Sequence, residues 1–234
     1  MSKNVDHQQR RLEVLAAARR VIVRDGIEAA TTRAIAREAG YSSGILTHYF
    51  DDKDDILSSL LRHSHERSRQ RRVRRTAGVT GLAALRELLL DSLPLDAERT
   101  RETRLEIDFW SRGLSARRLA EVQRREHAKL RAATRRRLAE AHDAGEIILA
   151  APPERPDARQ TDAKSDAGGH VGGDVEGHAR DDVAGVDDLD AVTKRLLALV
   201  DGLSLHLLLY PDRVTRAEAE RLVLAELDRL TPPS

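Results

Sequence analysis

The sequence predicts an all-α protein with a small N-terminal three-helix domain of the helix-turn-helix type and a larger C-terminal helical domain. Aromatic residues make up only 3% of the chain, whereas Leu, Ala and Arg, which favour helices over strands, dominate it. Apolar residues recur at helical spacing along most of the chain. A compact helix–turn–helix pattern, TTRAIAREAGYSSGILTHYFDDK, occupies residues 31–53.

The first predicted domain covers residues 1–52 and holds three helices. An apolar stripe at helical spacing predicts a helix over 8–25, which Gly26 ends. Residues 32–39 form the second helix, and Gly40 supplies the left-handed conformation that ends it at low cost. The third helix is expected over 43–50, with Ser42 as its N-cap.

The third helix carries polar side chains where a core helix would keep apolar ones. The second helix of such a pair can lie in the DNA major groove, with its first residues facing base edges. Ser43, Ile45, Thr47 and His48 are therefore candidates for base contacts. A serine can bond to several bases, and an isoleucine can contact a thymine methyl group.

Residues 31–53 resemble the DNA-binding domain of the TetR family of bacterial repressors. That family's pattern is roughly T-x-x-x-I-A-x-x-A-G-x-S-x-G-x-L-Y-x-Y-F-x-x-K. The matching positions are Thr31 or Thr32, Ile35, Ala36, Ala39, Gly40, Ser42, Gly44, Leu46, Tyr49, Phe50 and Lys53. The departure is Thr47, where the family usually has a tyrosine that contacts a phosphate; a threonine hydroxyl has a shorter reach.

The resemblance implies a set of residues at the DNA surface. Thr32, Tyr49 and Lys53 are the expected phosphate contacts. The full expected set is Thr32, Arg33, Ser42, Ser43, Gly44, Ile45, Thr47, His48, Tyr49 and Lys53. The implied partner is a palindromic double-stranded DNA operator bound by a homodimer.

The second predicted domain covers residues 53–234. Asp51 to Asp55 introduce a helix whose first turn suits acidic side chains through the helix dipole. Further helices are predicted over 79–93, 97–112, 115–144, 192–209 and 217–230. Residues 192–209 are apolar on every side, so they must be buried on nearly all faces.

Residues 151–190 have a different composition. They contain six Gly, three Pro and 11 acidic residues against four basic ones. Such a segment cannot bury enough apolar surface to offset the entropy of ordering it. We therefore predict a disordered acidic loop over 151–190.

The C-terminal domain resembles that of BetI-type repressors within the TetR family, through Phe109-Trp110, a long Arg-rich helix and the LVDGL run at 199–203. This resemblance implies a ligand-binding and dimerisation domain, with the last two helices at the subunit interface; a monomeric core is the alternative. Candidate contacts for an unknown small-molecule effector are Asp108, Phe109, Trp110 and His206. The alternatives are a surface ion pair of Asp108 with Arg104 or Arg112, and plain core positions for the two aromatic residues.

Charge is distributed unevenly along the chain. Residues 1–75 carry 16 Lys and Arg against 10 Asp and Glu, whereas the remainder carries 24 against 29. The basic half contains the helix-turn-helix, where attraction to DNA phosphates needs positive charge. Arg-rich solvated helix faces would give the same excess.

Other classes of protein find little support. The chain has no cysteine, no P-loop or HExxH motif, and no histidine pair at metal-binding spacing, so we predict no enzyme activity, metal or cofactor. Neither a transmembrane segment nor a secretory signal is indicated, so we expect a cytoplasmic protein that does not bind membranes. The alternative function is a helical adaptor or structural bundle without specific DNA binding.

Overall fold

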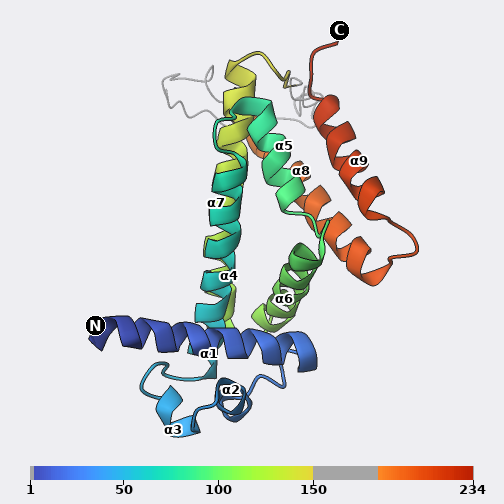
Figure 1. Cartoon of the computed structure of the whole chain (residues 1–234). Coiled ribbons are helices and arrows are strands. Elements are labelled where there is room, and N and C mark those ends of the chain that lie inside the picture. The colour runs from blue at the N-terminus through green and yellow to red at the C-terminus, as the bar shows by residue number, and fades with distance from the viewer. Residues whose placement is uncertain (1–2, 150–183, 234) are drawn as a thin grey trace, which may run out of the picture.

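The computed structural model describes residues 3–149 and 184–233, with side chains described within 6–149 and 189–233. The described part is helical, as predicted, and Figure 1 shows its arrangement. The helices are α1 (Lys3–Asp25), α2 (Thr32–Ala39), α3 (Ser43–Leu46), α4 (Lys53–Arg75), α5 (Gly81–Asp91), α6 (Ala97–Gly113), α7 (Arg117–Asp143), α8 (Ala184–Leu209) and α9 (Arg216–Asp228).

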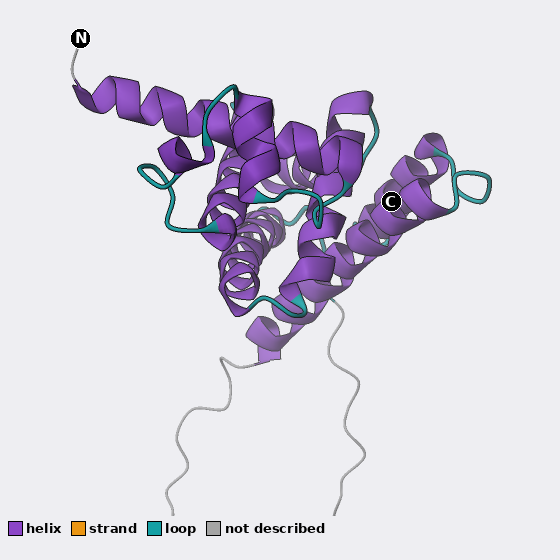
Figure 2. Ribbon diagram, turned by 90° about the horizontal axis from the view of Figure 1, so that it is seen from below, coloured by secondary structure: helices purple, strands orange, loops and turns teal. Residues whose placement is uncertain are grey.

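The helices α1, α2 and α3 form one end of the molecule, seen at the bottom of Figure 1. Seen from below, in Figure 2, α1 lies across the ends of the longer helices. Ile22, Ile35 and Leu46 are buried together in this end's core. The same apolar cluster includes Leu57 of α4 and Phe109 of α6, so the N-terminal end is packed directly on the helices that follow it.

A second apolar cluster lies at the other end and joins α5, α7, α8 and α9. It includes Leu89, Leu138, Val200 and Val223, all of which are nearly inaccessible to solvent. The helix α9 begins with a capping box, in which Thr215 and Glu218 each satisfy a backbone N–H at the helix start. The apolar contacts of this cluster hold α8 and α9 against α5 and α7.

The long helices α4 and α7 run side by side and connect the two ends (Figure 1). The first half of α4 is apolar and buried, with Ile56, Leu57, Leu60 and Leu61 in the N-terminal cluster. The second half is polar and rich in arginine. One helix therefore belongs to both ends of the molecule.

Three predicted boundaries differ from the observed ones by more than two residues. The helix α1 begins at Lys3 rather than at 8, and α3 ends at Leu46 rather than at 50. The helix α8 begins at Ala184, inside the segment predicted to be a disordered acidic loop. Asp190 of α8 accepts hydrogen bonds from Arg131 (2.6 Å) and Arg135 (3.1 Å) of α7, which neutralise part of the acidic charge. The prediction for 184–190 was therefore wrong, and the rest of that loop, 151–183, lies outside the described residues.

No helix in the described parts of the chain is both long and apolar enough to cross a membrane.

Candidate nucleic-acid interface and ligand cavity

The helix α2 is closed at both ends by the residues that the sequence indicated. The Thr31 hydroxyl accepts a hydrogen bond from the backbone N–H of Ala34 at 3.1 Å. Gly40 follows the helix with φ +74°, a left-handed conformation, and the N–H of Tyr41 donates to the carbonyl of Ala36 at 2.9 Å. This closure sets the turn that leads into α3.

The helix α3 is a single turn that continues as a series of tighter turns. Ser42 occupies the predicted N-cap position, but its side chain makes no capping hydrogen bond. The N–H groups of Tyr49 and Phe50 both donate to the carbonyl of Leu46, so the regular helical pattern is lost after that residue.

The predicted base contacts share one exposed surface of α3 and the turn after it. Ser42, Ser43, Gly44, Thr47 and His48 are exposed, and Ile45 is half-buried. The Thr47 hydroxyl donates to the carbonyl of Gly44 at 2.8 Å, so its proton is already used within the turn. Its lone pairs remain free to accept a hydrogen bond.

The three residues predicted to contact phosphates are less exposed than most of the predicted base contacts, and two of them already contact other residues. Lys53 Nζ lies 3.4 Å from the carbonyl oxygen of Ile27 and 3.5 Å from that of Glu28, in the loop before α2. Tyr49 is half-buried, with its ring 4.8 Å from that of His7, and its carbonyl accepts a hydrogen bond from Arg11. Thr32 is half-buried.

Arg33 is exposed on α2. On the same helix, Glu38 forms ion pairs with two arginines of α1. Arg20 donates to Glu38 at 2.7 Å and Arg24 does so at 3.0 Å, and these hydrogen bonds lower the pKa of the Glu38 carboxyl. The orientation of the helix-turn-helix on α1 is thus held by ion pairs as well as by apolar packing.

A cavity of about 520 Å³ lies in the second half of the molecule, between α4, α5, α6, α7 and α8. Its apolar wall includes Leu88, Leu130, Leu197 and Val200, together with Trp110. Volume and lining suit a small organic molecule, because ligand pockets are mostly apolar with a few placed polar groups.

A half-buried carboxylate, Glu106, lies at the wall of this cavity. It accepts a hydrogen bond from Trp110 Nε1 at 3.0 Å and another from Gln123, and His65 Nε2 lies 3.3 Å from it. Burial alone would raise the pKa of Glu106, but these partners together hold it below its usual value. Glu106 is therefore a satisfied charge, although Gln123 Oε1 is buried without a hydrogen-bond partner.

Asp201 is the second acid at this end of the cavity. It lies within α8, and its burial raises the pKa of its carboxyl; His127 opposes that rise and Glu106 adds to it. No hydrogen bond or ion pair from a described residue reaches its carboxyl group. Asp201 thus has a weakened preference for the charged form.

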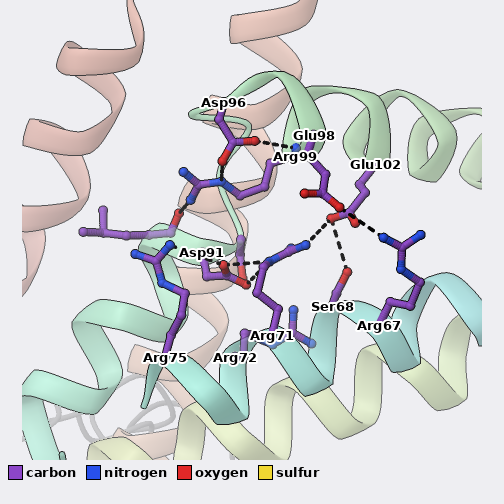
Figure 3. Close-up of polar contacts among 12 residues, drawn as sticks. Arg67, Ser68, Arg71, Arg72, Arg75, Asp91, Asp96, Glu98, Arg99 and Glu102 are labelled. Atoms are coloured by element: carbon purple, nitrogen blue, oxygen red, sulfur yellow. Dashed lines mark hydrogen bonds and ion pairs between the residues drawn. The ribbon is translucent and has the colours of Figure 1, made fainter. Parts of the chain in front are cut away.

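Figure 3 shows a network of ion pairs among helices that line the cavity. Arg71 of α4 lies 2.9 Å from Asp91 of α5 and 2.9 Å from Glu102 of α6. The side chain of Asp91 is completely buried, and Ser68 approaches Glu102 at 3.5 Å. Arg71 therefore links three helices around the cavity.

Of the four residues expected to contact an effector, the structure places Trp110 alone among those lining the cavity. Phe109 is 1% exposed and packs in the N-terminal apolar cluster. Asp108 is half-buried outside the cavity wall, and burial raises the pKa of its carboxyl. His206 is exposed and lies edge-on to Tyr210, with ring centres 5.5 Å apart.

Several polar residues of the cavity were not among the expected effector contacts. Asp201 could have been found, because it is an acid inside the most apolar stretch of the chain. Arg71, Arg72 and His65 lie in a segment that is polar on every side, so no sequence pattern showed which of them face inward. Their positions depend on how α4 packs against α5, α6 and α7.

Comparison with protein families gives two matches that together cover most of the chain. Residues 14–60 match the N-terminal model of the tetR family of bacterial regulatory proteins. Residues 81–161 and 174–232 match the C-terminal domain of BetI-type transcriptional repressors. The second match omits 162–173, which lie within the acidic segment.

Individual relatives agree with these matches. The chain is 26% identical to the HTH-type transcriptional regulator PksA of Bacillus subtilis, over 98% of this chain and 94% of that protein. It is 30% identical to BetI of Stenotrophomonas maltophilia over 52% of this chain and 63% of that protein.

Solved structures show the same fold. A Rhodococcus transcriptional regulator superposes with a TM-score of 0.70 at 22% identity, covering 94% of this chain and 95% of that one. A regulator from Saccharomonospora viridis, in complex with choline, gives 0.74 at 18% identity, covering 97% and 100%. From the family matches, this chain belongs to the TetR family of bacterial transcriptional regulators, with a C-terminal domain of the BetI type.

Proposed function

We propose that the protein is a homodimeric transcriptional repressor that a small molecule releases from a palindromic operator. Residues 1–52 would bind DNA, and 53–234 would bind the ligand and form the dimer. Two α3 helices, one per subunit, would enter successive major grooves about 34–36 Å apart. The protein would act in the cytoplasm, where its DNA lies, and would have no catalytic role.

The observation that carries this proposal is the double role of α4. Its first half packs in the N-terminal core through Ile56, Leu57, Leu60 and Leu61. Between Ser64 and Val73, its second half lines the cavity. A ligand that prefers one position of α4 would therefore bias the position of the helix-turn-helix, by as much as its affinity differs between the two positions.

Ion pairs give the N-terminal end a second link to the ligand-binding helices. Arg118, near the start of α7, lies 3.1 Å from Asp55 and 3.5 Å from Asp52. Arg112, near the end of α6, lies 3.6 Å from Glu28. A shift of α6 or α7 would be transmitted through these contacts as well as through α4.

The dimer is proposed from apolar surface on the last two helices. Leu209, the last residue of α8, is 60% exposed. Tyr210, which follows it, is 52% exposed, and Leu222 of α9 is 49% exposed. Arg195 of α8 and Glu226 of α9, 2.7 Å apart, hold the two helices together. A symmetric contact between two copies of this face would remove the exposed leucines from water.

The experiment that tests the function is selection of bound genomic fragments by the purified protein at near-physiological salt. We expect enrichment of a palindrome, with an affinity that falls steeply as salt increases. The neighbouring genes would then give compounds to test as effectors. An effector should release the palindrome from the protein.

The competing function is a helical adaptor without specific DNA binding. Such a protein would show neither a preferred site nor a steep salt dependence. A folded, dimeric sample that enriches no sequence, with or without the compounds tested, would favour that alternative. The loss of the usual tyrosine at Thr47 is the feature that keeps it open.

A further inference from the structure

We propose that the cavity takes an organic anion, whose acid group pairs with Arg72 and whose apolar body extends toward Trp110. The inference rests on the proposed function only in treating this ligand as the effector.

Nearly every arginine and lysine that lines the cavity already has an acid partner. Arg71 pairs with Asp91 and Glu102, as described above, and Arg99 with Asp96 at 2.9 Å. The remaining pairs are Arg69 with Glu66, Lys129 with Glu126, and Arg136 and Arg137 with Glu140. The charge of each of these cations is therefore compensated, at least in part, by an acid within ion-pair distance.

Arg72 is different. Among the residues that the structure describes, no acid lies within ion-pair distance of its guanidinium, and no hydrogen-bond acceptor is paired with it. In Figure 3 it lies beside Arg71, and no dashed line joins it to Asp91 or Glu102. Those two nearest acids are occupied by Arg71.

The position of Arg72 makes this lack of a partner costly. The residue is half-buried, and burial lowers the pKa of its guanidinium. Arginine nevertheless stays charged, so the ligand-free cavity holds a partly desolvated cation without a counterion. A carboxylate or a similar acid would satisfy it with two parallel hydrogen bonds.

The rest of the cavity indicates the shape of the ligand. His65 lies seven residues before Arg72 on the same face of α4, which places the two about 10 Å apart along the helix. Leu130, Leu197 and Val200 line the cavity with them, and Trp110 lies at the His65 end through its bond to Glu106. An apolar body of roughly this length would fit between the two ends.

A cationic ligand is the competing possibility, because Glu106 and Asp201 lie near Trp110. Glu106, however, is already satisfied by Trp110 and Gln123 and approached by His65. Asp201 is disposed toward its neutral form by burial. Asp201 and Arg72 both lack a partner, but Arg72 is the one whose charge does not depend on pH, and it favours an anion.

The test uses three probes with the same ten-carbon chain and different head groups: decanoate, 1-decanol and decyltrimethylammonium, each below its micelle-forming concentration. Trp110 is the only tryptophan in the chain, so its fluorescence reports binding at the cavity without DNA. We expect decanoate to bind at least tenfold more tightly than the other two. Equal binding, no binding of decanoate, or preference for the cation would overturn the proposal.

Variants assign the effect to Arg72. We expect Arg72→Gln to weaken decanoate binding about tenfold, Arg72→Lys to retain part of it, and Arg74→Gln to leave it unchanged, because Arg74 is exposed outside the cavity wall. Decanol binding should not change in any of them. Undiminished decanoate binding by Arg72→Gln would overturn the assignment.

A second measurement needs no ligand. Because a neutral side chain would remove an unpaired charge from the cavity, Arg72→Met should raise the thermal midpoint of the ligand-free protein. Arg71→Met should lower it, because the completely buried Asp91 would keep only its longer ion pair with Arg75, at 3.9 Å. A lower midpoint for Arg72→Met would mean that Arg72 is already satisfied and would overturn the proposal.

The DNA-release assay separates this proposal from the proposed function. If decanoate binds through Arg72 but leaves operator binding unchanged, the anion site stands and the effector role fails for that ligand. If the protein binds its operator but shows no preference for the anion, the function stands and this inference fails.

Discussion

Lys53 shows how single residues divide between structural and DNA-binding roles. Its Nζ lies 3.4 Å and 3.5 Å from two backbone carbonyls of the loop before α2, so it already stabilises that loop. A lysine has three donors, and one bound to carbonyls can still approach a phosphate. The sequence pattern predicted the position of Lys53 but gave no sign of these carbonyl contacts, because they join residues 25 and 26 positions apart.

We predict that Lys53→Ala weakens binding to every DNA sequence alike. The slope of log affinity against log salt should fall by about 1, the amount expected for one lost phosphate contact. Arg86→Ala is the matched control, because Arg86 is exposed on α5, away from the helix-turn-helix. Fluorescence anisotropy at several salt concentrations measures both slopes. An unchanged slope in the Lys53 variant would remove it from the phosphate contacts.

Base contacts should behave differently. We predict that His48→Ala, at an exposed position in the turn after α3, changes the preference among half-sites and leaves the salt slope nearly unchanged. The measurement is competition between the selected palindrome and single-base variants of it. If His48→Ala and Lys53→Ala both act uniformly on all sequences, the division into base and phosphate contacts is wrong.

The acid within α8 gives a prediction about pH. Burial raises the pKa of Asp201 in the folded protein, so its contribution to stability is fully present below the unfolded pKa of about 4. That contribution is lost as pH rises through the folded pKa. Asp201→Asn should therefore raise the thermal midpoint at pH 7 and change it little near pH 4. An equal effect at both pH values would mean that charge is not the cause.

Among the elements, α2 and α3 show which features of the fold could be read from the sequence. The bounds of α2 were predicted as observed, because Thr31 and Gly40 satisfy its two ends locally. The end of α3 was not predicted, because it depends on turns whose N–H groups donate hydrogen bonds to the carbonyl of Leu46. The start of α8 was also missed, since the pairing of Asp190 with Arg131 and Arg135 is a contact between distant segments. Local signals thus predicted the two ends of α2, whereas the end of α3, the start of α8 and the cavity depend on contacts that the local sequence does not show.

The two glycines around α3 form a matched pair for testing this element. Gly40 has φ +74°, so Gly40→Ala should lower the free energy of unfolding by about 1–2 kcal/mol. Gly44 lies in the helix without a positive φ, and a Cβ there would meet no atom within 4 Å. Gly44→Ala should raise the free energy of unfolding by about 0.5–1 kcal/mol. Urea unfolding measures both, and destabilisation by Gly44→Ala would contradict the α3 geometry.

The same pair separates folding from DNA binding. Because Gly44 is exposed on the proposed DNA surface, the methyl group of Gly44→Ala would hold the backbone away from DNA. We expect weaker operator binding by a more stable protein. Undiminished binding would place α3 further from the DNA than proposed.

At the scale of the whole molecule, two apolar cores are joined by long helices, and α7 contributes to both of them. The N-terminal core contains Leu57 of α4 and Phe109 of α6, while the second contains Val200 of α8 and Val223 of α9. The cavity lies beside the second core, and α4 extends from it to the first. The proposed ligand and DNA sites are thus joined by packed helices rather than by a flexible linker. In the proposed mechanism, control of the DNA site also requires that two subunits hold a fixed spacing through α8 and α9.

The last prediction tests that requirement. Leu209→Glu combined with Leu222→Glu should raise the dimer dissociation constant on the order of 100-fold or more, because each copy would bury two carboxylates without partners in the proposed contact. Leu114→Glu is the control: Leu114 is 92% exposed at the end of α6, away from α8 and α9, and its variant should remain dimeric. Sedimentation velocity over a range of concentrations measures the equilibrium. The monomeric variant should keep its helical content and lose most of its affinity for the palindrome, since each subunit would then bind a half-site alone. A double variant that remains dimeric would move the subunit contact to another surface, and the exposed leucines would need a different explanation.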